Sequence, residues 1–287
     1  MALIDEDAAT YRARRAWCAG DMVLGAQTCP AQMWAYADMN PARMPAKEAR
    51  ELDDGTAIHL AVCEPSEFEA RTQIIDAADY RTKVAQEYRD GARFSGRVPL
   101  LVHQVPQIMA MRQAVLDSPA GIWLEGAKFE QSFTWDFSFT WDLSLTRQVG
   151  PPLSCKGRVD IAAPFGPLLD VKSVRSASPA AFERAVVQYG HHIRAAWYQD
   201  GWRASEGEPR RYGYLVVQKA APYLVNLFWP SPRALEWGRR EYRRVLQQIL
   251  ECQEAGSWRG YEWGREVELP VGAEYRLAEA FAEKDAP

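Results

Sequence analysis

The chain has 287 residues, of which 47% are hydrophobic and 25% charged, and its formal net charge at pH 7 is −4. This composition is typical of a soluble globular protein with a full core, and the charge balance alone indicates no nucleic-acid partner. There is no apolar run of about 18 residues and no apolar signal segment at the N-terminus, so we expect neither a membrane span nor export. The five cysteines are scattered without a CxxC pair, which favours reduced thiols in the cytoplasm over disulfides or structural zinc.

Helical spacing of apolar residues in the first part of the chain predicts helices over residues 29–40, 46–63, 79–93 and 103–117. From Phe129 to Thr146 the pattern changes, and odd positions are mostly apolar while even positions are polar. Such alternation predicts a half-buried strand. The strand is unusually long because Ser-Phe-Thr-Trp-Asp occurs twice, beginning at Ser132 and again at Ser138. The sequence VGPP at 149–152 predicts the turn that ends it.

Strand and helix signals alternate in the second half of the chain. They predict strands over 156–163 and 167–174, a helix from Ser178 to about Gln199, strands over 212–219 and 223–230, and a charged helix over 232–254. We therefore predict one α+β domain, in which a mixed sheet is flanked by helices. Its expected parts are a mainly helical region over 1–100, a core over 101–263 and a peripheral tail over 264–287.

The predicted hairpin around Pro-Phe-Gly carries the residues best suited to chemistry. If its glycine takes the left-handed conformation of a three-residue loop, facing residues have numbers that sum to 330. Apolar Val159 then faces Val171 on one side of the hairpin. On the other side Asp160 faces Asp170, and Lys172 lies next along the strand. Facing carboxylates repel each other, and a Mg²⁺ ion bound between them would remove the repulsion. A lysine beside the ion could orient or deprotonate an attacking water. The alternative is a surface hairpin whose polar side chains face solvent.

An aspartate followed about ten residues later by Asp-x-Lys across a hairpin resembles the PD-(D/E)XK nuclease superfamily. Further motifs resemble its RecE-type exonucleases (exodeoxyribonuclease VIII). GTAIHLAVCEPSEFEAR looks like the family's histidine-bearing helix, with His59 at the histidine position, and EQSFTW looks like its acidic strand. CKGRVD ends at Asp160, and LLDVKSV holds Asp170 and Lys172. With YGHHIRAAWYQDGW, VVQKAAPYLVNLF and GSWRGY, the resemblance extends over residues 55–261 in the family's order.

The resemblance implies a restriction-endonuclease-like fold and a Mg²⁺-dependent 5′→3′ exonuclease, with Mn²⁺ as a substitute, acting on linear double-stranded DNA ends. It also implies a ring-shaped homo-oligomer and a single-strand-annealing partner in phage-type recombination. The implied metal-site residues are His59, Glu130, Asp160, Asp170 and the Val171 carbonyl, and Lys172 is expected to position the attacking water. The alternatives are an endonuclease or a single-strand or flap nuclease of the same superfamily, and a non-catalytic DNA-binding protein of the same fold.

DNA contacts are expected on the helix that follows the hairpin. Its polar residues Gln188, His191, Arg194 and Tyr198 are suited to backbone phosphates. Arg194 stands where the family's Gln-x-x-x-Tyr motif has glutamine. Four arginines on the last helix form either a DNA-steering patch or a solvated face: Arg239, Arg240, Arg243 and Arg244.

The repeated pentapeptide leaves two candidates for the acidic strand residue, Glu130 and Asp136. Each lies on the polar face, two residues before a serine and five before a tryptophan. With VGPP as the turn, facing residues sum to about 300, which places Asp136 about 13 Å and Glu130 about 33 Å from the position opposite Asp160. The family's motif, Glu-x-Ser-x-x-Trp, favours Glu130. A bulge between the two copies would bring Glu130 opposite Asp160. We predict Glu130, with Asp136 as the alternative.

Overall fold

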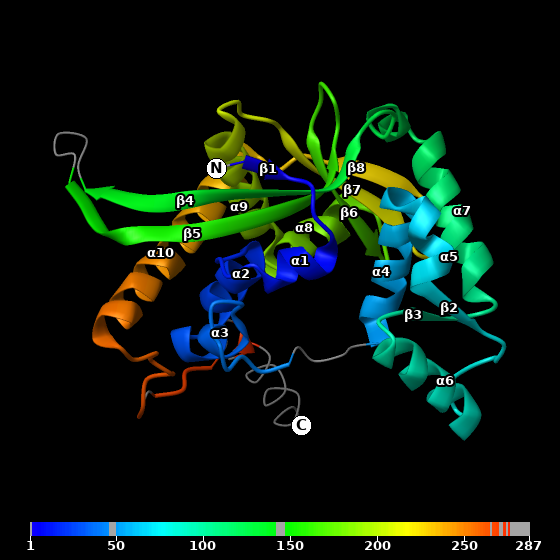
Figure 1. Cartoon of the computed structure of the whole chain (residues 1–287), viewed down its shortest axis with the longest axis horizontal. Helices are drawn as coiled ribbons and strands as arrows, with labels where there is room; N and C mark the ends of the chain where they lie inside the picture. The colour runs from blue at the N-terminus through cyan, green and yellow to red at the C-terminus, as the bar shows by residue number, and fades with distance from the viewer. Residues whose placement is uncertain are drawn as a thin grey trace, which may run out of the picture.

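A six-stranded mixed sheet forms the centre of the protein (Figure 1). The computed structural model describes residues 2–45, 50–141, 147–264, 266–269, 272–273 and 275. The strand order is β1-β4-β5-β6-β7-β8, with bounds Ala2–Ile4, Lys128–Trp141, Arg147–Ala162, Leu168–Val174, Tyr212–Gln218 and Val225–Phe228. Neighbouring strands are antiparallel, except that β6 and β7 are parallel. The predicted α+β class is confirmed.

Helices cover both faces of the sheet. On one face α9 (His191–Glu206) packs on β4 and β5, and α10 (Pro232–Ala255) and α2 (Ala19–Gln27) pack on α9. On the other face α4 (Arg50–Cys63) and α7 (Gln104–Asp117) pack on each other and on the parallel strands. Alternate residues of β6 and β7 supply the two cores, as the period of two in strands requires: Leu168, Tyr212, Tyr214 and Val216 face α9, whereas Leu169, Val171, Leu215 and Val217 face α4 and α7.

The four helices predicted in the first part of the chain are confirmed as α3 (Pro30–Tyr36), α4, α6 (Lys83–Phe94) and α7. The single helix predicted from Ser178 to about Gln199 is wrong. It is divided into α8 (Pro179–Gln188) and α9 by Gly190, which has a left-handed backbone (φ 64°). A Cβ atom at Gly190 would lie 2.8 Å from Val23, so close packing as well as φ requires glycine there.

The strands β4 and β5 form a long two-stranded ribbon that extends beyond the rest of the sheet (Figure 1). The turn predicted at 149–152 is wrong, because these residues lie within β5. They are accommodated by a register shift: Phe137 pairs with Leu153, but Phe139 pairs with Val149. Pro151 and Pro152 cannot donate a backbone hydrogen bond to a neighbouring strand. They are tolerated because they lie at this bulge, on a strand edge that has no neighbour there among the described residues. The connection between Trp141 and Arg147 lies outside the described residues.

Several short elements were not predicted. They are β1, α1 (Ala8–Ala13), α2, a 3₁₀ turn (Pro65–Glu67), α5 (Phe68–Arg71), the parallel pair β2 (Thr72–Ile75) and β3 (Val98–Leu101), and a 3₁₀ turn (Pro119–Trp123). The strand β1 forms the edge of the main sheet beside β4. Trp258, after α10, stacks on Trp34 with ring centroids 4.3 Å apart, so α3 and the segment after α10 pack together. In the part of the chain that the structure describes, every helix is too short or too polar to span a membrane.

Candidate active site

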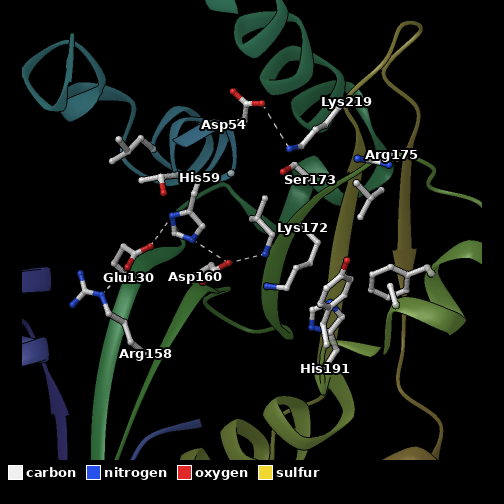
Figure 2. A pocket seen from close by; sticks show the side chains of 18 of the residues that line it. Asp54, His59, Glu130, Arg158, Asp160, Lys172, Ser173, Arg175, His191 and Lys219 are labelled. Atoms are coloured by element: carbon white, nitrogen blue, oxygen red, sulfur yellow. Dashed lines mark hydrogen bonds and ion pairs between the residues drawn. The ribbon is translucent and has the colours of Figure 1, made fainter. Parts of the chain in front are cut away.

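A cleft of about 1370 Å³ contains most of the predicted site residues (Figure 2). Its walls come from α1, α4, α8 and α9, and its floor from β4, β5 and β6. The predicted residues that line it are His59, Glu130, Asp160, Val171, Lys172, Gln188, His191 and Tyr198. Segments more than a hundred residues apart in sequence therefore meet in one concave surface, which is the usual form of a binding site.

His59 lies between two carboxylates (Figure 2). Its Nδ1 atom is 3.0 Å from Oε1 of Glu130, and its Nε2 atom is 3.0 Å from Oδ2 of Asp160. Burial opposes the charged imidazolium, but the charge and hydrogen bond of Asp160 and the charge of Glu130 raise the pKa of His59 to about 9. In the absence of metal, His59 is therefore protonated at neutral pH and connects the two acids.

The structure brings Glu130, and not Asp136, to this cluster. Facing residues in this part of β4 and β5 sum to 290, with Phe129 paired to Ile161 and Gln131 paired to Val159, so Glu130 lies opposite Asp160. The sum of about 300 expected from the sequence was wrong because β4 and β5 are connected between Trp141 and Arg147, earlier in the chain than VGPP. Asp136 is exposed, about 20 Å from Glu130 along the strand. Its carboxylate accepts a hydrogen bond from the Ser154 hydroxyl (3.1 Å).

The backbone of Glu130, the third residue of β4, is left-handed, with φ of 51°. Phe129, just before it, packs in the core with α4 and α7, whereas Phe133 and Trp135, after it, pack in the core with α9. The unusual backbone therefore changes the face to which the odd residues of β4 point, which period-two reasoning could not predict. The Glu130 carboxylate is held from the other side by Arg158, whose Nε donates to Oε2 at 2.6 Å.

Asp160, Asp170 and Lys172 meet where β5 and β6 separate. The predicted sum of 330 is confirmed at Ile161 with Leu169 and at Ala162 with Leu168, although the hairpin glycine, Gly166, has no left-handed backbone. Beyond these pairs the backbone pairing of β5 with β6 ends, and a side chain of β5 contacts the backbone of β6 instead. The Val171 amide donates to Oδ2 of Asp160 at 2.7 Å, and the Lys172 ammonium forms an ion pair with the Asp170 carboxylate.

The carboxylates differ in the effect of their surroundings on the pKa. Burial raises the pKa of Asp170, aided by the charge of Asp160 and opposed by Lys172. Burial likewise raises the pKa of Glu130. For Asp160 burial is outweighed by His59, Lys172 and the Val171 amide, and its pKa is lowered. Neighbouring acids with displaced pKa values at a cleft are a physical indication of a functional site.

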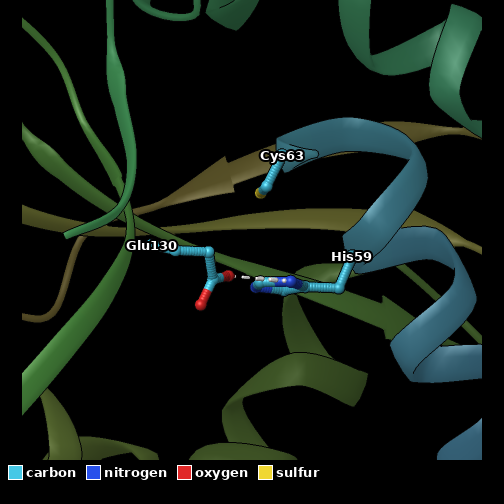
Figure 3. Close-up of side chains that lie close together, drawn as sticks. All are labelled: His59, Cys63 and Glu130. Atoms are coloured by element: carbon cyan, nitrogen blue, oxygen red, sulfur yellow. Dashed lines mark ion pairs between the residues drawn. The ribbon is translucent and has the colours of Figure 1, made fainter. Parts of the chain in front are cut away.

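The donor atoms of this site fit a divalent metal. Oε1 of Glu130 and Oδ2 of Asp170 are buried and make no hydrogen bond to any described residue, although positively charged nitrogens lie beside them. Carboxylate oxygens are the protein ligands that Mg²⁺ prefers, and a cation satisfies them and removes their mutual repulsion. His59, Cys63 and Glu130 also place three possible ligand atoms within 4.8 Å of one another (Figure 3). Sequence reasoning missed Cys63 and Arg158, although Cys63 lies one helical turn after His59.

Three of the four residues predicted to bind DNA line the cleft, and the fourth does not. Arg194 lies behind the cleft wall, where burial opposes its charge but Tyr198 and Asp170 raise its pKa. The His191 ring stacks on Phe182, and burial and neighbouring positive charges lower its pKa to about 3, so it is neutral. Five basic residues also line the cleft: Arg12, Arg71, Arg175, Arg184 and Lys219. Two of them are compensated, because Arg71 pairs with Glu64 and Lys219 with Asp54.

On the last helix, three of the four arginines of the sequence-predicted patch form ion pairs. Arg239 pairs with Asp200, Arg240 with Glu236, and Arg244 with Glu241. This favours the solvated-face interpretation of that patch, since its charge is largely compensated.

Comparison with known proteins extends these observations. Residues 142–263, which include Asp160, Asp170 and Lys172, match the family described as "PDDEXK-like domain of unknown function (DUF3799)". A crystal structure titled "Putative exonuclease" from Eubacterium rectale superposes with a TM-score of 0.61 at 11% identity, covering 96% of this chain and 99% of that one. These findings support the PD-(D/E)XK nuclease superfamily.

The PD-(D/E)XK likeness confirms the restriction-endonuclease-like fold predicted from the sequence. Nucleases of the superfamily use divalent metals, in agreement with the donor atoms of the cleft. A second solved structure, titled "Crystal structure of SSO0001", aligns with a TM-score of only 0.28 at 11% identity, over 70% of this chain and 86% of that one. No curated protein matches the chain.

Proposed function

We propose that this protein is a divalent-metal-dependent deoxyribonuclease of the RecE type, acting as a 5′→3′ exonuclease on linear double-stranded DNA. The observation that carries the proposal is the meeting of Glu130, Asp160 and Lys172 with His59 in one cleft, where Lys172 forms an ion pair with the buried Asp170. The printed description of the Eubacterium rectale neighbour as an exonuclease agrees with it.

The proposed chemistry is hydrolysis of a phosphodiester bond by in-line attack of water. Asp160, Asp170, Glu130 and the Val171 carbonyl would hold a divalent cation, which would lower the pKa of a bound water and neutralise charge on the phosphate. The Lys172 ammonium, held beside Asp170, orients the attacking water and stabilises the negative charge that develops on the phosphoryl oxygens. His59 fixes the orientation of the carboxylates on either side of it.

The cleft rim supports DNA as the substrate. Arg12, Arg175 and Arg184 are exposed, and none of them has an ion-pair partner among the described residues. Uncompensated cations around a catalytic cleft attract the phosphate backbone without selecting a base sequence. Gln188 and Tyr198 belong to the same wall and are proposed phosphate contacts. Arg194 is proposed to act on Asp170 electrostatically rather than on DNA directly.

The same proposal includes Mg²⁺ as the metal, with Mn²⁺ as a substitute, and DNA ends as the substrate. It also includes a ring-shaped homo-oligomer and a single-strand-annealing partner in phage-type recombination, within the cytoplasm. These finer statements depend on the RecE-type resemblance of the motifs between residues 55 and 261. The single-domain layout of 1–287 is proposed on the same basis.

The decisive experiment compares linear duplex DNA labelled at either end with covalently closed circular DNA, in the presence of Mg²⁺. We expect degradation of the linear substrate alone, with early release of 5′-terminal label, and its loss in Asp170→Asn. Asparagine is nearly isosteric with a carboxyl whose pKa burial already raises, so this variant is expected to fold. Asp117→Asn, on the exposed end of α7, is the matched control. Nicked circles would indicate an endonuclease, and no cleavage with Mg²⁺ or Mn²⁺ would overturn the nuclease proposal.

A further inference from the structure

Cys63 lies beside the candidate nuclease site but has no part in the proposed nuclease chemistry. It follows His59 by four residues on α4, so both side chains point from the same face of the helix. Its thiol sulfur, a nitrogen of His59 and a carboxylate oxygen of Glu130 lie within 4.8 Å of one another (Figure 3). Only 3% of Cys63 is exposed, and the thiol points toward these polar groups rather than into an apolar core alone.

The three ligand types select a different metal from Mg²⁺. Mg²⁺ binds oxygen atoms and does not take a thiolate, whereas sulfur, imidazole nitrogen and carboxylate together suit Zn²⁺ and related cations. A tetrahedral ion with bonds of about 2.0–2.3 Å holds its ligand atoms about 3.5 Å apart, so small side-chain rotations suffice to close the site. His59 and Glu130 line the cleft, which leaves the fourth position open to a water molecule.

The surroundings of Cys63 favour a cation. Its thiol lies within 4.8 Å of the Glu130 carboxylate, and a second carboxylate, that of Asp160, lies on the other side of the His59 ring. A divalent cation offsets this negative charge and binds the thiolate and the neutral imidazole, as the thiol proton and one proton of the His59 imidazolium pass to solvent. Oε1 of Glu130 is buried without a hydrogen bond to any described residue and faces Nδ1 of His59 at 3.0 Å. The site therefore has an oxygen available for the ion.

His59 connects such a site to the nuclease centre, so an ion bound there affects the nuclease residues. A neutral imidazole binds a metal through one nitrogen while the other carries its proton. An ion on Nδ1, beside Cys63, leaves the Nε2 proton to donate to Asp160, 3.0 Å away on the other side of the ring. The same ion also binds the Glu130 carboxylate, which the proposed nuclease centre needs as a ligand for its own metal. Occupation of the two metal positions is therefore mutually exclusive.

We propose that His59, Cys63 and Glu130 form a binding site for a thiophilic divalent cation of the Zn²⁺ type, and that its occupation inhibits Mg²⁺-dependent cleavage. The binding itself is independent of the proposed function, whereas the inhibition rests on it. Because the carboxylate and imidazole are shared with the nuclease centre and the thiol is not, Cys63 distinguishes the two sites.

Binding is tested directly with Co²⁺, whose thiolate complexes have a charge-transfer absorption in the near ultraviolet. Metal-free wild-type protein is expected to develop this band with one Co²⁺ per chain and to lose it on addition of Zn²⁺. Cys63→Ser is expected to lack the band. The matched control is Cys29→Ser, at the N-cap of α3, where serine is a favoured residue. Circular dichroism checks that both variants are folded. The absence of the band in wild type, or its persistence in Cys63→Ser, would overturn the proposal.

Inhibition is tested by titrating Zn²⁺ into cleavage reactions at fixed Mg²⁺ concentration. The Zn²⁺ concentration for half-inhibition is expected to rise at least about tenfold in Cys63→Ser and to stay unchanged in Cys29→Ser. Equal inhibition of wild type and Cys63→Ser would overturn the regulatory part. A Co²⁺–thiolate band in a protein without nuclease activity would uphold the site and refute the function proposed above, so the two failures are distinguishable.

Discussion

The stability of the metal-free protein should decrease at alkaline pH because of one residue, His59. Its pKa is raised from 6.5 to about 9 by Asp160 and Glu130. A raised pKa contributes stability that is fully present below pH 6.5 and is lost as the pH rises through about 9. A difference of 2.5 pKa units corresponds to about 3 kcal/mol of unfolding free energy.

The assay is urea unfolding between pH 6 and pH 10 in EDTA, for wild type and for His59→Gln. The difference in unfolding free energy between the two should shrink by about 3 kcal/mol across this range, since glutamine does not titrate. Taking the difference removes the contribution of other titrating groups. The exposed His103→Gln variant is the control and should follow wild type. A difference that stays constant with pH would refute the ion-pair account of His59.

Three other outcomes are expected. Glu130→Gln should lower Mg²⁺-dependent cleavage by about 100-fold or more, whereas Asp136→Asn should stay within about twofold of wild type; the reverse result would assign the site to the second copy of the pentapeptide. Lys172→Ala should lower kcat by about 10²–10³-fold with little change in Tm, and normal turnover would exclude its catalytic role. Lys156, fully buried, donates to Asp38 at 2.7 Å, so Lys156→Met should cost about 3–5 kcal/mol of stability in urea unfolding, and an unchanged midpoint would contradict a structural role for this pair.

The sequence was most informative where a local period or a short motif determines the structure. Alternation in residues 129–146 predicted β4, and the Asp-x-Lys hairpin predicted the register that brings Asp160 close to Lys172. The order of the motifs also predicted that His59, far away in the chain, belongs to the same site. The first two features depend on backbone periodicity and on residue types, both of which are visible in one sequence, whereas the prediction for His59 came from the resemblance to RecE-type exonucleases.

Other features depend on contacts between distant segments and could not be read locally. The position of Glu130 opposite Asp160 depends on where the ribbon turns and on a bulge beyond Phe137. The division of α8 from α9 at Gly190 depends on the proximity of Val23. Three residues are too few for a strand signal, so β1 is recognisable only once it pairs with β4.

The left-handed backbone of Glu130 has a consequence for the evolution of the protein. A non-glycine residue in this conformation costs about 1–2 kcal/mol, which Glu130→Gly would recover while removing the carboxylate from the cleft. With the role proposed above for Glu130, selection for stability and selection for activity act in opposite directions at this one position. In lineages where the activity is no longer needed, glycine or asparagine should accumulate here first, and that replacement would mark descendants that keep the fold without the chemistry.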